Sequence, residues 1–179
     1  MARTNSCDSL NGNLILGCNN NIGGLKRAFA LEKNRISSTT LNSPTQEISA
    51  ITTVASAKFY EFEFSKGAAN YVETETTDLA TGRTIWEQVF TLNLNRREKT
   101  KRDQLLLMSK GKDMCWLVQD NNDVWWLLGE NFGTNLMTNV GGSGSNKTDP
   151  NQYVLTFKGE EALPANTVLN ATAITVINV

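Results

Sequence analysis

Hydrophobic and polar side chains alternate along several short stretches of this chain, which is the pattern of β-strands with one buried face. The clearest stretch is residues 84–94, where Trp86, Phe90 and Leu92 share one face. Residues 59–64 alternate in the same way, with aromatic side chains on one face and glutamates on the other. The pattern therefore predicts a protein built mainly from short strands.

Turns rich in Gly, Asn and Pro separate the predicted strands. The predicted strands cover residues 25–32, 48–54, 59–64, 71–77, 84–94, 114–118, 124–128, 153–160 and 173–177. We expect residues 59–64 and 71–77 to form a hairpin, because a turn signal lies between them. Residues 37–49 are polar and are predicted to form a loop, and the glycine-rich residues 141–151 a flexible loop. We expect the flexible loop, and an Asn-rich arm at the start of the chain, to reach neighbouring subunits.

One segment contains no glycine and shows no alternation of hydrophobic and polar side chains. Residues 96–110 favour a helix that ends at Gly111. About eight strands and one helix indicate a mainly β fold, a β-sandwich or partial barrel with one flanking α-helix. We divide the chain into an N-terminal arm (1–21), a β domain (22–163) and a C-terminal segment with a final strand (164–179).

The composition narrows the possible chemistry. The chain of 179 residues has no histidine, so a serine–histidine triad, a cysteine–histidine pair and a histidine zinc site are all excluded. Its three cysteines form no paired motif, so we expect neither a disulfide framework nor a zinc site, and no cofactor. A formal net charge of −1 argues against a protein that coats nucleic acid. A carboxylate-only hydrolase or a lysine-based enzyme stays open on composition, but we expect a protein that is not an enzyme.

Neither a membrane-spanning run nor a signal peptide is evident in the sequence. We expect synthesis in the cytoplasm and no membrane partner.

Acidic side chains concentrate in the predicted hairpin and the strand that follows it. Residues 59–88 hold six acidic and two basic side chains. One hypothesis is that Glu61, Glu63, Glu73 and Glu75 face a channel through which DNA passes without binding. The alternative is an ordinary solvated sheet face. A pair of glutamates could also serve a glycosidase, but catalytic carboxylates usually come from different elements with unlike environments.

Basic side chains gather on the predicted helix. They are Arg96, Arg97, Lys99, Lys101 and Arg102. They could pair with an acidic patch on a neighbouring subunit and so steer assembly. The alternatives are a solvated helix face and, with less support because aromatic residues are missing between the charges, direct contact with DNA.

Tryptophans offer a third candidate site. Trp125 and Trp126 are adjacent on a strand and must point to opposite faces, so we expect at most one in the core. The other, with Trp116, could anchor a subunit interface or form a sugar-binding platform. The alternative is that both Trp125 and Trp126 are covered within the chain.

The order of several motifs is similar to that of a known family. The motifs are Ile22-Gly23-Gly24-Leu25-Lys26, Phe59-Tyr60-Glu61-Phe62-Glu63, Glu73-Thr74-Glu75, Trp86-Glu87-Gln88-Val89-Phe90-Thr91-Leu92, Lys99-Thr100-Lys101-Arg102-Asp103-Gln104-Leu105, Trp126-Leu127-Leu128-Gly129 and Leu155-Thr156-Phe157-Lys158-Gly159-Glu160. In this order they resemble the tail-tube and tail ring proteins of tailed bacteriophages, particularly the crAss-like phages that infect Bacteroidetes. The likeness spans residues 22–161.

The resemblance implies a tail-tube-like β-sandwich that forms a six-fold or twelve-fold homo-oligomeric ring around a channel for DNA. It implies a virion structural protein of the tail, assembled in the host cytoplasm, with other tail or portal proteins as partners. Members of this family are not enzymes. The rival hypothesis from another class is a carbohydrate-binding β-sandwich module that uses exposed tryptophans.

Overall fold

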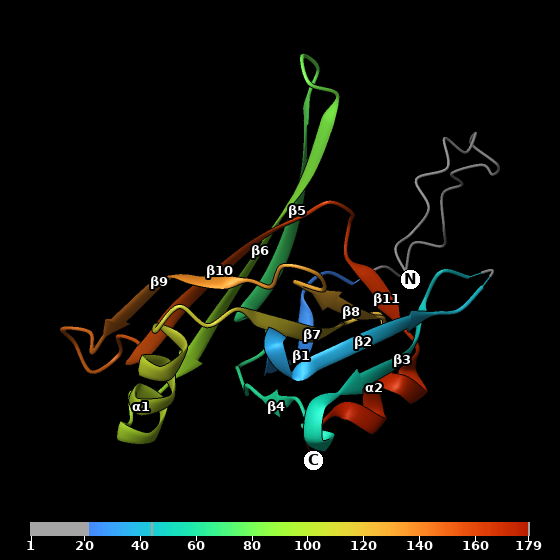
Figure 1. Ribbon diagram of the computed structural model, residues 1–179. Coiled ribbons are helices and arrows are strands. Elements are labelled where there is room, and N and C mark those ends of the chain that lie inside the picture. Colours follow the sequence, from blue (N-terminus) through green and yellow to red (C-terminus); the bar gives the residue numbers. More distant parts are fainter. Residues whose placement is uncertain (1–21, 44, 179) are drawn as a thin grey trace.

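Two β-sheets and two short helices make up the fold, which we describe from a computed structural model covering residues 22–43 and 45–178 (Figure 1). The larger sheet has seven strands in the order β2 (Ile36–Leu41), β3 (Ile48–Thr53), β11 (Asn166–Val168), β8 (Trp125–Leu128), β7 (Met114–Asp120), β1 (Leu25–Glu32) and β4 (Tyr60–Glu61). The smaller sheet has the order β5 (Ala69–Asp78), β6 (Arg83–Asn95), β10 (Gln152–Glu161) and β9 (Asn135–Gly142). The helices are α1 (Lys99–Met108) and α2 (Asn170–Val176), with 3₁₀ turns at Lys33–Arg35 and Val54–Ser56.

The main core lies between the two sheets. Trp116 on β7 is at its centre, with ring centroids 4.6 Å from both Phe90 and Phe157 of the smaller sheet. Leu105 and Met108 of α1 close one end of this core. Aromatic rings at such distances add to the stabilisation from burial. The predicted mainly β sandwich with a flanking helix is therefore confirmed.

A second core lies on the other face of the seven-stranded sheet. Phe29 and Trp125 pack there against Ala173 and Val176 of α2. Strand β1 contributes to both cores, because Ala28 and Ala30 face the first and Phe29 faces the second. This burial on both faces explains why its sequence alternates only weakly.

Most of the predicted elements are present. Strands β1, β6 and β10 cover the stretches predicted at residues 25–32, 84–94 and 153–160, and β7 and β8 form the predicted hairpin. Helix α1 lies within the predicted residues 96–110. Gly111, just after the helix, has φ +73°, a conformation that glycine adopts without strain.

The predicted hairpin of residues 59–64 and 71–77 is wrong. Strand β4 pairs with β1 in the larger sheet, with Phe29 opposite Glu61, whereas β5 pairs with β6 in the smaller one. Between them the chain crosses from one sheet to the other, and Phe62 packs against the main core. Alternation identifies buried side chains but not the strand that pairs with them.

Three local predictions also need correction. Residues 37–49, predicted as a loop, contain most of β2, which pairs with β3. Residues 135–142 form β9, which was not predicted. Residues 173–177, predicted as a final strand, lie mostly in α2, a second helix beyond the single one expected.

The reason for α2 is tertiary packing. Residues 173–177 contain β-branched side chains that favour strands. In the helix, however, Thr172, Ala173 and Val176 lie on one side and are buried. Because β11 joins the seven-stranded sheet and α2 covers it, the described part of segment 164–178 packs as part of the β domain.

Candidate functional site

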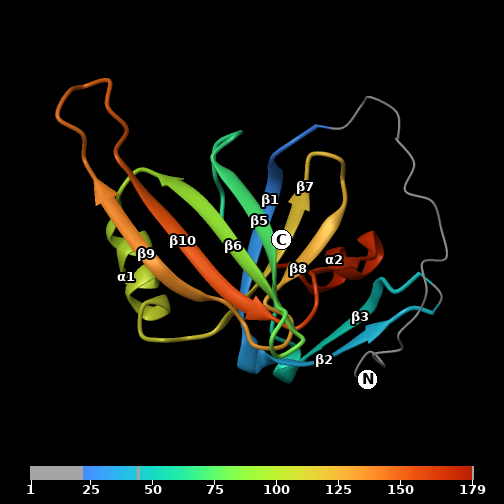
Figure 2. The ribbon, with the colours of Figure 1, turned by 90° about the horizontal axis from the view of Figure 1, so that it is seen from above.

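The outer face of the four-stranded sheet is uncovered by any other layer of the described residues (Figure 2). Its side chains are mainly valine and threonine in rows across the strands. Thr91, Thr156 and Thr138 form one row, and Val154 is opposite Val140. Val140, on the edge strand, is 62% exposed. Most sheets of this kind are polar on their open face, so the valines make this face less polar than is usual.

Ionic contacts on this face involve Lys158. Its Nζ lies 2.7 Å from the Glu87 carboxylate and 3.8 Å from that of Glu160. The hydrogen bond to Glu87 raises the pKa of Lys158 above its ordinary value. The lysine therefore stays protonated at neutral pH and links two central strands across their open face.

Both edges of this sheet have free backbone groups within the described chain. Strands β5 and β9 are the outermost strands, and each pairs with one neighbour only. Nearly every side chain of β9 is exposed, including Met137 and Val140. Exposed edge strands with apolar side chains are templates for pairing with another chain.

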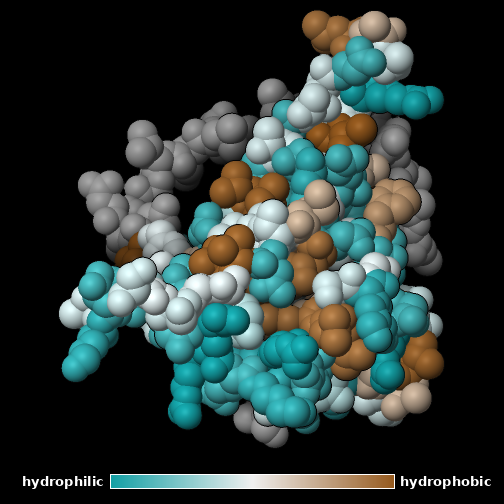
Figure 3. Space-filling model, turned by 90° about the vertical axis from the view of Figure 1, so that its left-hand side faces the viewer, coloured by the Kyte–Doolittle hydropathy of each residue, from teal (hydrophilic) through white to brown (hydrophobic). Residues whose placement is uncertain are grey.

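The β5–β6 hairpin projects from the body of the molecule (Figure 1). Strand β10 pairs with β6 only as far as Trp86, so residues 76–85 extend past the sheet. At the tip Leu79 is 93% exposed, and Figure 3 shows a hydrophobic patch at the end of this projection. An almost fully exposed leucine therefore lies at the end of the projecting hairpin.

Hydrogen bonds fix the turn at this tip. The Asp78 carboxylate accepts hydrogen bonds from the Ala80 amide at 2.9 Å and from the Thr81 hydroxyl at 2.7 Å. The Thr81 hydroxyl, and then the Ala80 amide, lower the pKa of Asp78. Gly82 completes the turn with φ +66°. Leu79 is thus presented by a preformed turn.

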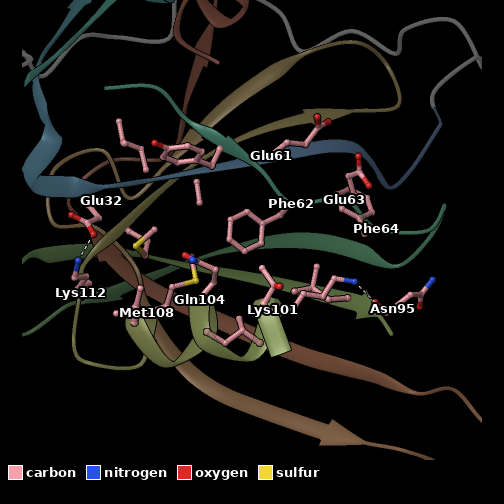
Figure 4. A pocket seen from close by; sticks show the side chains of 18 of the residues that line it. Glu32, Glu61, Phe62, Glu63, Phe64, Asn95, Lys101, Gln104, Met108 and Lys112 are labelled. Atoms are coloured by element: carbon pink, nitrogen blue, oxygen red, sulfur yellow. Dashed lines mark hydrogen bonds and ion pairs between the residues drawn. The ribbon is translucent and has the colours of Figure 1, made fainter. Parts of the chain in front are cut away.

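A groove of about 1000 Å³ lies at the opposite end of β6 (Figure 4). Helix α1 forms one wall, and the chain from Tyr60 to Ser65 forms the other. Phe62 points into it, and Phe64 and Met108 contribute further apolar surface. At one end Glu32 forms ion pairs with Lys112 and Arg35. The groove is therefore apolar inside and charged at its rim.

The four predicted channel-facing glutamates do not form a single face. Glu61 on β4 is paired with Arg27 at 3.0 Å, whereas Glu73 and Glu75 are on β5 in the other sheet. Glu63 is exposed beside the groove, and Glu75 is exposed on the hairpin.

Glu73 is directed towards the chain itself. Its carboxylate accepts hydrogen bonds from the Ala165 amide at 2.6 Å, Gln88 Nε2 at 3.0 Å and the Tyr71 hydroxyl at 3.3 Å. Burial, followed by the nearby Glu73 charge, raises the pKa of Tyr71. Glu73 therefore has a structural role in connecting β5 to the segment before β11.

The predicted basic residues lie together on and just before α1. Lys99 and Arg102 both contact Asp103, at 2.7 and 3.5 Å, and Arg96 lies 3.4 Å from Glu98. The Arg97 guanidinium lies over the Tyr153 ring, and Lys101 donates to the Asn95 carbonyl at 2.6 Å. Lys101 is thus partly used within the chain, while Lys99, Arg102 and Arg96 remain largely exposed.

Two of the three tryptophans singled out in the sequence, Trp116 and Trp125, are covered within the chain. Trp125 is 2% exposed in the second core, and its indole donates to Asn170 at 3.0 Å. Trp126 packs partly buried against Tyr71, and its indole donates to Asp120 at 3.4 Å. Trp116 is fully buried. Trp116 and Trp125 are therefore inaccessible to a neighbouring subunit, whereas Trp126 is partly exposed.

The exposed apolar residues Leu79, Val72 and Val140 were not singled out from the sequence. The sequence does contain a signal for two of them, because Val72 and Val140 are apolar residues in stretches that are otherwise largely polar. The sequence does not show that the face carrying Val72 and Val140 is left uncovered by the other described residues. The predicted N-terminal arm, with Cys7 and Cys18, lies outside the described residues.

The remaining chemistry within the described residues is limited. They contain no cluster of three acidic, cysteine or histidine side chains that could hold a metal ion. Burial raises the pKa of the Cys115 thiol to about 12, and its Sγ donates to the Gly129 carbonyl. Within the described ranges, neither helix has the length and apolar character needed to cross a bilayer.

Comparison of the chain with protein-family models, curated proteins and solved structures found no match. Its function is therefore inferred from the surfaces described above.

Proposed function

We propose that this chain is a structural protein that assembles with copies of itself into a ring or tube of a phage tail, around a channel for genome delivery. The observation that supports it best is the open four-stranded sheet, with β5 and β9 unpaired on their outer edges within the described chain. Pairing β5 of one copy with β9 of the next would satisfy both edges. Such a contact uses two different surfaces, and it closes into a ring or continues as a tube.

In this assembly the outer face of the four-stranded sheet lines the channel. The face combines threonine and valine with the Glu87–Lys158–Glu160 group, so it offers little positive charge to phosphate. DNA can then pass without binding, because affinity for the backbone comes from lysine and arginine. The glutamates predicted for this role do not share this wall, since Glu61 belongs to the larger sheet and Glu63 lies outside both sheets.

Lysine substitutions at the two edges test the proposal. Val72→Lys on β5 and Val140→Lys on β9 place a charge on exposed edge side chains, which opposes pairing without touching the core. Ile174→Lys, at an exposed position on α2, is the matched control. Sedimentation velocity and negative-stain microscopy of the full chain give the readout.

We expect the wild-type chain and Ile174→Lys to form rings or tubes, and each edge variant to shift at least about tenfold in association constant towards the monomer, or about 1.4 kcal/mol. A wild-type chain that stays monomeric at every concentration would overturn the proposal. So would edge variants that assemble like the control.

A further inference from the structure

We propose that the tip of the β5–β6 hairpin of one copy binds in the groove beside α1 of the next copy. The inference rests on the proposed self-assembly and adds a second contact, distinct from edge pairing. It follows from four features of the described residues: the groove, the tip, their charges and their separation.

The groove has the size and lining to receive a chain segment. Its volume of about 1000 Å³ is at the upper end of the range for small-molecule sites. Phe62 points into it (Figure 4). The half-exposed Leu107 of α1 also lines it. An exposed leucine can bury its side chain between them and remove apolar surface of both partners from water.

The hairpin tip presents an exposed apolar side chain on a fixed turn. Leu79 is almost fully exposed, and the Asp78 carboxylate already holds the turn in place. Binding of a preformed turn costs less conformational entropy than binding of a loose loop. The tip therefore suits insertion better than a flexible segment would.

The hairpin and the α1 region carry opposite charge, whereas the charged residues that line the groove itself are balanced: Glu32, Glu61 and Glu63 with Arg35, Lys101 and Lys112. Residues 73–87 of the hairpin hold four acidic side chains and one basic side chain. Residues 96–112, which include α1, hold seven basic and two acidic side chains. Opposite charge on the hairpin and on the α1 wall steers these two regions together.

The separation of tip and groove requires a second copy. Both lie on β6: its first residue, Arg83, is at the hairpin tip, and its last, Asn95, lines the groove. Thirteen residues of extended strand place them roughly 40 Å apart in one chain. The tip cannot fold back into its own groove, so each copy offers a tip to one neighbour and a groove to another. This head-to-tail contact is compatible with a ring or tube.

Site-specific cross-linking of two differently tagged copies tests the contact. Both copies carry Cys7→Ser and Cys18→Ser, while the buried Cys115 is kept. One copy also carries Leu79→Cys at the tip, and the other Leu107→Cys in the groove. A short bis-maleimide reagent is added to the mixture, and covalent dimers are resolved by mass. The control pairs Leu79→Cys with Ile174→Cys on α2, at a similarly exposed position.

We expect a covalent dimer between the Leu79→Cys copy and the Leu107→Cys copy. The yield of covalent dimer should be at least tenfold lower when the Leu79→Cys copy is mixed with the Ile174→Cys copy. If the wild-type chain assembles by sedimentation but the tip does not link preferentially to the groove, this inference fails and the proposed function stands. Efficient linking of Leu79→Cys copies to each other would show a tip-to-tip contact and also overturn it. A wild-type chain that does not assemble overturns both proposals.

Discussion

At the scale of single residues, the buried carboxylate of Glu161 shows how one side chain organises a loop. It accepts hydrogen bonds from the Asn131 and Phe132 amides, both at 2.9 Å, and from the Asn131 side chain at 3.1 Å. These donors belong to the turn that follows β8. Glu161 is at the end of β10 in the other sheet, so the carboxylate connects the two layers.

We predict that Glu161→Ala lowers the free energy of unfolding by about 2 kcal/mol, because two partly buried backbone amides lose a charged acceptor. Urea unfolding followed by circular dichroism measures the change. Glu160→Ala is the control, since the neighbouring side chain points to the open face and is exposed. Equal effects of the two substitutions would contradict the structural role of Glu161.

At the scale of elements, helix α1 has one side in the core and one side in solvent. Leu105 is 2% exposed and packs in the main core, whereas its neighbour Leu106 is 52% exposed. The helix has no side-chain cap at its first turn, and its stability comes from this packing.

We predict that Leu105→Ala lowers the free energy of unfolding by about 3 kcal/mol, because it leaves a cavity beneath the helix. Leu106→Ala is the matched control and should change it by less than about 0.5 kcal/mol. Chemical denaturation of both variants against the wild-type chain provides the comparison. A large loss in the Leu106 variant would show that the helix is buried on its other side.

At the scale of the whole molecule, charge is distributed unevenly. The projecting hairpin is acidic and the region of α1 is basic, although the chain as a whole has a formal net charge of only −1. These regions occupy opposite ends of β6. Such a distribution favours head-to-tail contacts over contacts between identical surfaces.

We predict that self-association weakens as salt rises, because the screening length falls from about 30 Å at 0.01 M to about 3 Å at 1 M ionic strength. Sedimentation velocity over a salt series should show at least a tenfold loss in association constant between these limits. Glu75→Gln should reduce the salt dependence by removing one exposed hairpin charge. Association that strengthens throughout the series would favour a purely apolar contact.

The sequence alone determined the β class of the fold, most of its strands and the place of α1. Alternation in residues 84–94 and the turn before them follow from local chemistry, since side-chain period and turn residues are properties of neighbouring positions. The absence of histidine likewise excluded whole classes of catalytic site through composition alone.

Only the tertiary structure decided which segments meet. It placed β4 beside β1, turned residues 170–176 into a helix over the second core, and directed Glu73 inward while leaving Leu79 exposed. These outcomes depend on contacts between residues far apart in the chain. A local sequence pattern indicates that a side chain is buried. The residues and strands that it packs against depend on the packing of the whole molecule.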